Sequence, residues 1–160
     1  MTLDAYRPQV AGVLDLLVRV ALRIRVTPNL LSVLSFFLAL AGGLLYAVGS
    51  ILGGLLCVIA NAVCDSVDGA LARALGEHGP RGDFLDHAID RYADIFIITG
   101  IFAGGFASWQ IGVFALTGVL MASYLGTQAQ AVGVGRYYGG LLGRADRLVM
   151  LMAASVLDLV

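Results

Sequence analysis

The chain has 160 residues, of which 59% are hydrophobic and only 13% are charged, and its formal net charge is −1. This composition excludes an ordinary soluble globular domain and is typical of a protein that crosses a membrane several times. The near-zero net charge identifies no partner, and we expect no nucleic acid among the partners.

The first segment of the chain, residues 3–24, is predicted to form an amphipathic helix. Its apolar residues recur at steps of three and four, and most of its charged residues, among them Arg7, Arg19 and Arg23, fall between them. A helix of this kind suits the surface of a membrane, and the chain offers no soluble domain to receive it. We therefore expect residues 1–25 to form a juxtamembrane helix that precedes the membrane domain.

The rest of the chain, residues 26–160, is predicted to be one all-α membrane domain. Thr27 is expected to cap the first spanning helix, with Pro28 at its first position. Spans are expected at about 30–48, 51–74, 83–104 and 109–133, with a fifth that begins near 145. Only 13 residues follow Arg147, whereas about 20 are needed to cross, so the last helix is partial or the chain has been trimmed. The predicted fold is thus a polytopic helix bundle with five to six spans.

The distribution of the ten basic residues, all of them arginine, predicts the orientation of this bundle. They lie before the first span, around the link between the second and third spans, and around the link between the fourth and fifth. The other two links carry no charge. By the positive-inside rule, we expect a multi-pass protein of the cell membrane with its N-terminus on the cytoplasmic side.

Two pairs of carboxylates interrupt the predicted spans. Asp65 and Asp68 are three residues apart, and Asp86 and Asp90 are four apart, so each pair lies on one face of its helix. An ionised Asp in a membrane span costs at least about 2.5–3.5 kcal/mol, which makes such residues functional candidates. Two helices that direct carboxylate pairs at one another would form an all-oxygen site for Mg²⁺ or Mn²⁺.

The carboxylates belong to the longer pattern D-x2-D-G-x2-A-R-x8-G-x3-D-x3-D. In this chain it is filled by Asp65, Asp68, Gly69, Ala72, Arg73, Gly82, Asp86 and Asp90. The pattern resembles the signature of the CDP-alcohol phosphotransferase family, and the match is complete. The early surface helix and the Thr-Pro-Asn before the first span resemble the family too, whose members look like six-span proteins.

The resemblance implies a reaction in which an alcohol attacks the lipid-bearing phosphorus of a CDP-linked lipid, of the CDP-archaeol or CDP-diacylglycerol type, and CMP leaves. It implies two divalent cations held by Asp65, Asp68, Asp86 and Asp90, with Asp90 also the general base. It further implies a homodimer. The residues expected to line the nucleotide site are Pro28, Asn29, Asp65, Gly69, Ala72, Arg73 and Gly82.

A second polar segment lies around the link between the fourth and fifth spans. Its arginines, Arg136, Arg144 and Arg147, are predicted to bind an anionic acceptor, although they would also serve as topology-setting residues. The segment looks like the archaeal branch of the family that uses inositol phosphate, whose bacterial counterparts are phosphatidylinositol phosphate synthases. Glycerol phosphate, serine and inositol stay open as other acceptors.

Three other interpretations compete with that of a CDP-alcohol phosphotransferase. The carboxylates could form a charge ladder with Arg73, Arg81 and Arg91, or line the path of a cation channel or transporter. A non-catalytic lipid-binding scaffold is a third reading, against which the intact Asp90 argues. Asp83 is expected to favour the start of a helix, whereas Asp94 lies deeper and could hold an arginine or support the metal ligands.

Overall fold

The computed structural model describes residues 7–77, 79–135 and 143–159, which contain six helices and no strand. The helices are α1 (Arg7–Arg23), α2 (Pro28–Ala47), α3 (Ile51–Leu75), α4 (Pro80–Ala103), α5 (Trp109–Ala131) and α6 (Arg144–Asp158). The predicted all-α fold is confirmed. The helix expected from residue 83 begins earlier, at Pro80, where a proline is favourable because its missing N–H needs no partner.

Three of the described helices, α2, α3 and α5, are long and apolar enough to cross a membrane. Helix α4 is as long as these but carries several charged side chains, and α6 has only 15 residues. The expected number of five to six spans therefore stays a prediction.

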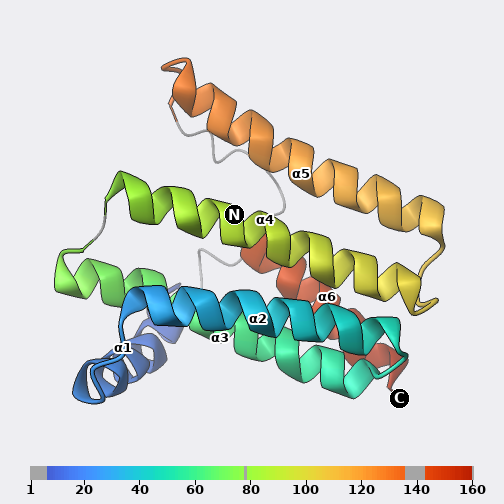
Figure 1. The fold of residues 1–160 in the computed structure, drawn as a ribbon, viewed down its shortest axis with the longest axis horizontal. Helices are drawn as coiled ribbons and strands as arrows, with labels where there is room; N and C mark the ends of the chain where they lie inside the picture. The colour runs from blue at the N-terminus through green and yellow to red at the C-terminus, as the bar shows by residue number, and fades with distance from the viewer. Residues whose placement is uncertain (1–6, 78, 136–142, 160) are drawn as a thin grey trace.

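The bundle is organised around α2, which packs against both α3 and α4, while α6 packs against α3 and α5 against α4 (Figure 1). The links between α2, α3 and α4 are short, so consecutive helices run in opposite directions. The start of α2, the end of α3 and the start of α4 consequently meet at one end of the bundle. This end holds the motif carboxylates.

The contact between α2 and α4 is made backbone to backbone through two glycines. A Cβ atom at Gly43 would overlap with the carbonyl of Phe96, and one at Gly100 would overlap with the backbone of Gly43. Small residues let membrane helices approach closely without a hydrophobic driving force. Close packing here fixes how far α4 and its carboxylates lie from α2.

The boundaries of α2 and α3 follow from their end residues. The Thr27 side chain accepts a hydrogen bond from the Leu30 N–H at 3.3 Å, and Pro28 occupies the first turn, as predicted. Helix α3 ends at Gly76, whose φ of 69° is in the left-handed region where glycine is favoured. That turn directs the chain back into α4.

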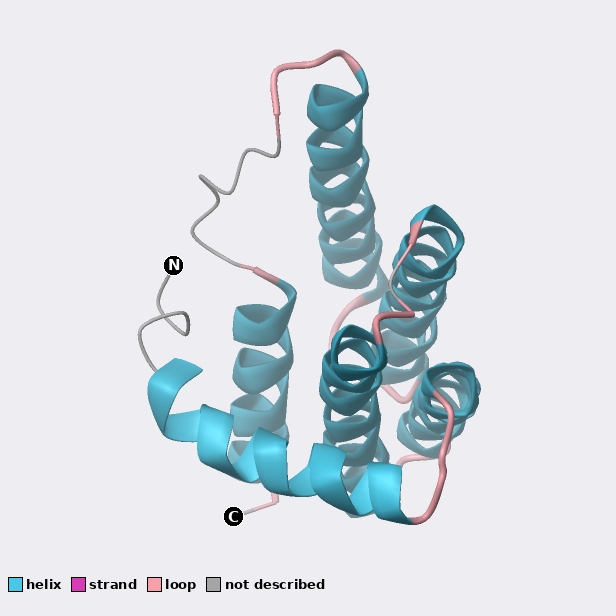
Figure 2. Ribbon diagram, turned by 90° about the vertical axis from the view of Figure 1, so that its left-hand side faces the viewer, coloured by secondary structure: helices cyan, strands magenta, loops and turns pink. Residues whose placement is uncertain are grey.

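Helix α1 lies across one end of the bundle, as Figure 2 shows. Val18 and Ala21 are buried against Val67 and Leu71 of α3. On another side of α1, a stripe of apolar residues stays exposed at helical spacing: Val13, Leu16, Val20 and Ile24. An exposed apolar stripe beside arginines fits a helix that lies in a membrane surface.

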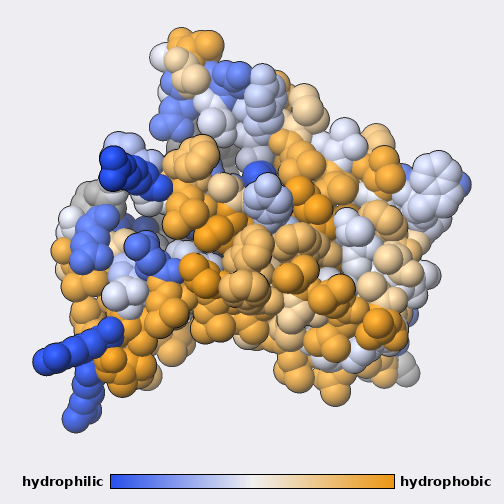
Figure 3. Space-filling view, viewed as in Figure 1, coloured by the Kyte–Doolittle hydropathy of each residue, from blue (hydrophilic) through white to orange (hydrophobic). Residues whose placement is uncertain are grey.

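Hydrophobic side chains cover most of the face seen in Figure 3, and hydrophilic ones gather at the end that carries α1. Large apolar side chains on the outside of the helices are strongly exposed, among them Phe37 at 57% and Phe114 at 83%. Apolar surface on this scale is unfavourable in water and fits contact with lipid. The structure is therefore that of a membrane protein.

Candidate metal and nucleotide site

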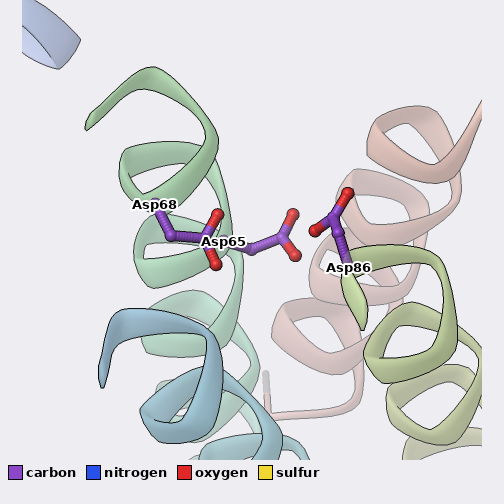
Figure 4. A group of neighbouring side chains, drawn as sticks. All are labelled: Asp65, Asp68 and Asp86. Atoms are coloured by element: carbon purple, nitrogen blue, oxygen red, sulfur yellow. The ribbon is translucent and has the colours of Figure 1, made fainter. Parts of the chain in front are cut away.

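Three carboxylates from two helices converge at the polar end of the bundle. Asp65 and Asp68 come from α3 and Asp86 from α4, and their side chains point toward one another (Figure 4). One oxygen from each lies within 4.8 Å of the others. Asp68 is buried and the other two are partly buried. The pairing of the two helix faces expected from the i,i+3 and i,i+4 spacing is thus present for these three residues.

The chemistry of this group fits a divalent cation. Its donors are carboxylate oxygens alone, which Mg²⁺ and Mn²⁺ prefer. Three acids this close in a partly dry place also repel one another, and a cation removes that repulsion. Asp65, Asp68 and Asp86 would hold such an ion.

One residue that supports this group was not found from the sequence. Ser32 of α2 donates a hydrogen bond to Asp68 Oδ2 at 2.6 Å. Ser32 lies one turn after Pro28 in a mostly apolar helix that also contains Ser35, and a serine in a membrane span carries little signal by itself. Only its packing against α3 identifies it.

A cavity of about 760 Å³ adjoins the carboxylates. Asp68 and Asp86 form part of its wall, together with the arginines Arg73 and Arg81. Of the seven residues predicted to line the nucleotide site, six line this cavity: Pro28, Asn29, Gly69, Ala72, Arg73 and Gly82. The seventh, Asp65, belongs to the carboxylate group and is not part of the cavity wall.

The two motif glycines keep the cavity open. A Cβ atom at Gly82 would meet nothing within 4 Å, and one at Gly69 would meet only Arg73 Nη1, at 3.5 Å. Both would therefore project into free space rather than into the protein. Any larger side chain at either position would fill the cavity, which is a physical reason for glycine there.

The fourth motif carboxylate, Asp90, lies beside an arginine of α6 rather than within the group of three. Arg144 Nη1 is 2.7 Å from Asp90 Oδ1 and 2.5 Å from Asp65 Oδ2. Arg144 thereby joins α6 to both α3 and α4. Its Nε and Nη2 atoms are buried and find no hydrogen-bond partner among the described residues.

The sequence left the role of Asp94 open, and in the structure its carboxylate contacts two arginines. It is 6% exposed, and its Oδ2 accepts a hydrogen bond from Arg147 Nη2 at 3.3 Å and lies 3.4 Å from Arg91 Nη2. Arg91 also reaches Asp90, at 3.6 Å. Asp83 stands in the first turn of α4, as expected for a residue that favours a helix start.

Two of the three predicted acceptor residues contact carboxylates in the structure. Arg144 and Arg147 start α6 and face carboxylates of α3 and α4. Arg136 lies outside the described residues. Of the charge ladder considered for the four motif carboxylates, the structure shows the contact between Arg91 and Asp90, whereas Arg73 and Arg81 line the cavity.

Fold and site together define a class of protein: a helical membrane enzyme whose carboxylates suit a divalent cation beside a polar cavity. More narrowly, the chain belongs to the CDP-alcohol phosphatidyltransferase family, whose model matches residues 25–160. It is thus an enzyme of the CDP-alcohol phosphotransferase type, and membership of this family argues against the transporter and scaffold readings.

Two curated relatives match nearly the whole chain. The archaetidylinositol phosphate synthase of Pyrococcus horikoshii is 33% identical over 99% of this chain and 84% of its own length. The archaetidylinositol phosphate synthase of Methanothermobacter thermautotrophicus is 34% identical over 96% of this chain and 77% of its own length.

Solved structures of the Mycobacterium tuberculosis phosphatidylinositol phosphate synthase PgsA1 share the fold. The one with CDP-DAG bound superposes with a TM-score of 0.78 at 28% identity, covering 92% of this chain and 77% of that one. The one in complex with manganese and citrate has a TM-score of 0.77 at 29% identity, covering 89% of this chain and 71% of that one.

Proposed function

We propose that this protein transfers a lipid phosphoryl group from a CDP-linked lipid to an alcohol and releases CMP. The observation that carries the proposal is the shared wall between the cavity and the carboxylate group, formed by Asp68 and Asp86. A nucleotide in the cavity would have its pyrophosphate next to the carboxylates. The relatives support a lipid donor, since PgsA1 has been solved with CDP-DAG bound.

Each group of residues at the site would have a separate role in the transfer. The divalent cations held at the carboxylates would neutralise the pyrophosphate and polarise its phosphorus. Arg73, in the cavity wall, would give a forked contact to phosphate oxygens.

Asp90 is suited to the role of general base. It stands at the edge of the group of three rather than within it, on the side where Arg144 enters. It would take the proton from the acceptor hydroxyl as that oxygen forms its bond to the lipid phosphorus. The bond from this phosphorus to the bridging oxygen breaks, and CMP leaves with the electron pair. Arg144 would limit the charge that builds up around Asp90.

The acceptor that the site suits best is inositol phosphate. Arg144 presents buried Nε and Nη2 groups that have no partner among the described residues, and a phosphate would satisfy them. Serine, glycerol and inositol carry no such group. The archaeal relatives, both named archaetidylinositol phosphate synthases, support the same acceptor. The donor would then be of the CDP-archaeol or CDP-diacylglycerol type.

The proposal includes the orientation of the protein in the membrane and its assembly. The described arginines beyond residue 10 lie on α1, in the turn after it, or in the half of the bundle that holds the site, so this end would face the cytoplasm. Residues 1–25 would then lie on the cytoplasmic membrane surface and residues 26–160 would form the transferase domain. A homodimer in the membrane lipid stays the expected assembly.

The test is release of CMP from a CDP-linked lipid by the purified protein with Mg²⁺ or Mn²⁺. We expect Asp90→Asn to lower kcat by at least about a hundredfold, because general-base catalysis contributes on that order. Binding of CMP, measured by thermal protection, should survive in the variant. Asp158→Asn, the same chemical change at the far end of α6, is the matched control. Full activity of Asp90→Asn would remove the assigned base.

The same assay with a panel of acceptors tests the choice of alcohol. Inositol phosphate should release CMP, whereas inositol and serine should not. Glycerol phosphate is the informative competitor because it shares the phosphate. If inositol releases CMP as readily as inositol phosphate, the anionic-acceptor assignment is wrong while the transferase reaction stands.

A further inference from the structure

Asp94 is a buried carboxylate that the proposed chemistry does not use. It lies outside the group of three carboxylates and outside the cavity wall. Only 6% of it is exposed. A buried charge of this kind is costly unless it is paired, and here one oxygen, Oδ2, faces two arginines. The pairing explains how Asp94 is tolerated but not what it does.

Arg147, the partner of Asp94 on α6, connects Asp94 to the site. Arg147 and Arg144 are three residues apart, so they occupy one face at the start of α6. Arg144 reaches Asp65 and Asp90, and Arg147 reaches Asp94. The first turn of α6 is therefore held by three carboxylates, one from α3 and two from α4.

These three anchors are not equivalent during the proposed reaction. Asp65 is a proposed cation ligand and Asp90 the proposed base, so both exchange their partners during turnover. Asp94 has neither task and stays paired throughout. The Asp94–Arg147 contact is then the anchor that keeps the start of α6 against α4 when the other two contacts of Arg144 change.

We propose that Asp94 is a positioning residue. Through Arg147 it fixes the first turn of α6, and it thereby presents the buried N–H groups of Arg144 to the phosphate of an anionic acceptor. Arg91, from within α4, lies near both Asp90 and Asp94 and shares with Arg147 the charge of Asp94. The inference rests on the proposed function for its acceptor, but the position of α6 can be measured without it.

The kinetic test uses Asp94→Asn, which keeps the size of the side chain and removes its charge. We expect the KM for inositol phosphate to rise about tenfold or more, on the scale of lost supporting contacts in ligand sites. The kcat at saturating acceptor and the affinity for CMP should stay within about twofold of wild type, because the cavity is built from α2, α3 and the start of α4. Asp158→Asn should change neither.

A double-mutant cycle separates a positional role from a merely structural one. Arg147→Gln should reproduce the effect of Asp94→Asn, Arg147→Lys should restore part of it, and the double variant should be no worse than either single one. Equal losses of acceptor and CMP affinity with a lower melting temperature would make Asp94 an ordinary core residue. An unchanged KM would also overturn the proposal.

Hydrogen exchange supplies the measurement that does not depend on the acceptor. In Asp94→Asn, the amides of residues 147–150 should exchange faster while those of α3 and α4 keep their protection. If wild type does not use inositol phosphate but α6 loosens in the variant, the acceptor assignment fails and the positioning role stands. If α6 exchanges as in wild type, the positioning role is wrong whatever the acceptor.

Discussion

At the scale of single residues, the site depends on a hydroxyl that the motif does not contain. Ser32 donates to Asp68 Oδ2 at 2.6 Å and lines the cavity next to it. Asp68 is buried, so the hydrogen bond both lowers the cost of a charge on it and fixes the direction of the carboxylate. Ser32 thus connects the wall of the cavity to the carboxylate group.

Replacing Ser32 by Ala should weaken cation binding. Loss of a hydrogen bond that orients a metal ligand typically costs about 10–100-fold in metal affinity, and we expect Mn²⁺ binding to fall within that range. The change is measurable by titration of Mn²⁺ with electron paramagnetic resonance. Ser66→Ala is the control, because Ser66 is exposed and donates its hydrogen bond to the Ala62 carbonyl of its own helix. Equal Mn²⁺ affinity in Ser32→Ala and wild type would show that Asp68 holds its direction without this bond.

At the scale of helices, the distance between the two halves of the motif is set by α2. Asp65 and Asp68 belong to α3 and Asp86 to α4, but α3 and α4 each pack on α2. The glycine contact of α2 with α4, at Gly43 and Gly100, lies far along α4 from the carboxylates. A shift there would pivot α4 and open the site at its other end.

Gly100→Ala should therefore destabilise the protein and loosen the site together. The added Cβ would meet the backbone of Gly43, which cannot give way as a side chain can, and overpacking of this kind costs about 1–3 kcal/mol. We expect a lower melting temperature and weaker Mn²⁺ binding. Gly118→Ala in α5 is the matched control, since nothing lies within 4 Å of its new Cβ and Ala favours the helix. A Gly100→Ala protein as stable as Gly118→Ala would contradict the close contact of α2 and α4.

At the scale of the whole molecule, polarity is separated between the two ends of an apolar bundle. The end with α1 and the site carries arginines, carboxylates and the cavity. The opposite end, with the α2–α3 and α4–α5 links, carries none of the arginines in the described part of the chain. This asymmetry fits a site that draws an anionic nucleotide from one side of the membrane and a lipid from within it.

Cysteine labelling in intact cells should report this asymmetry. In a background without Cys57 and Cys64, we expect Val48→Cys, in the α2–α3 link, to react with a membrane-impermeant maleimide from outside. Glu77→Cys, in the α3–α4 link, should react only after the membrane is permeabilised. Both side chains are exposed in the structure. The reverse pattern would place the site on the outer side and refute the cytoplasmic assignment.

The sequence alone determined the helical fold of this protein, the helix faces on which its carboxylates lie, and most of the residues that line the cavity. These features depend on local order: apolar runs specify helices, Thr27 and Pro28 specify a helix start, and i,i+3 or i,i+4 spacing places two Asp on one face. Six of the seven residues expected at the nucleotide site line one cavity because they lie on or next to helix ends that short links bring together.

Only the tertiary structure decided which partner each charged or polar side chain has. Arg144 lies 79 residues after Asp65, and Ser32 lies 36 residues before Asp68, so no local pattern pairs them. Asp94 could have held an arginine or supported the metal ligands until the packing of α6 brought Arg147 to it. The physical reason is that pairing of buried charges is settled by close packing between helices, which the order of residues along one helix does not contain.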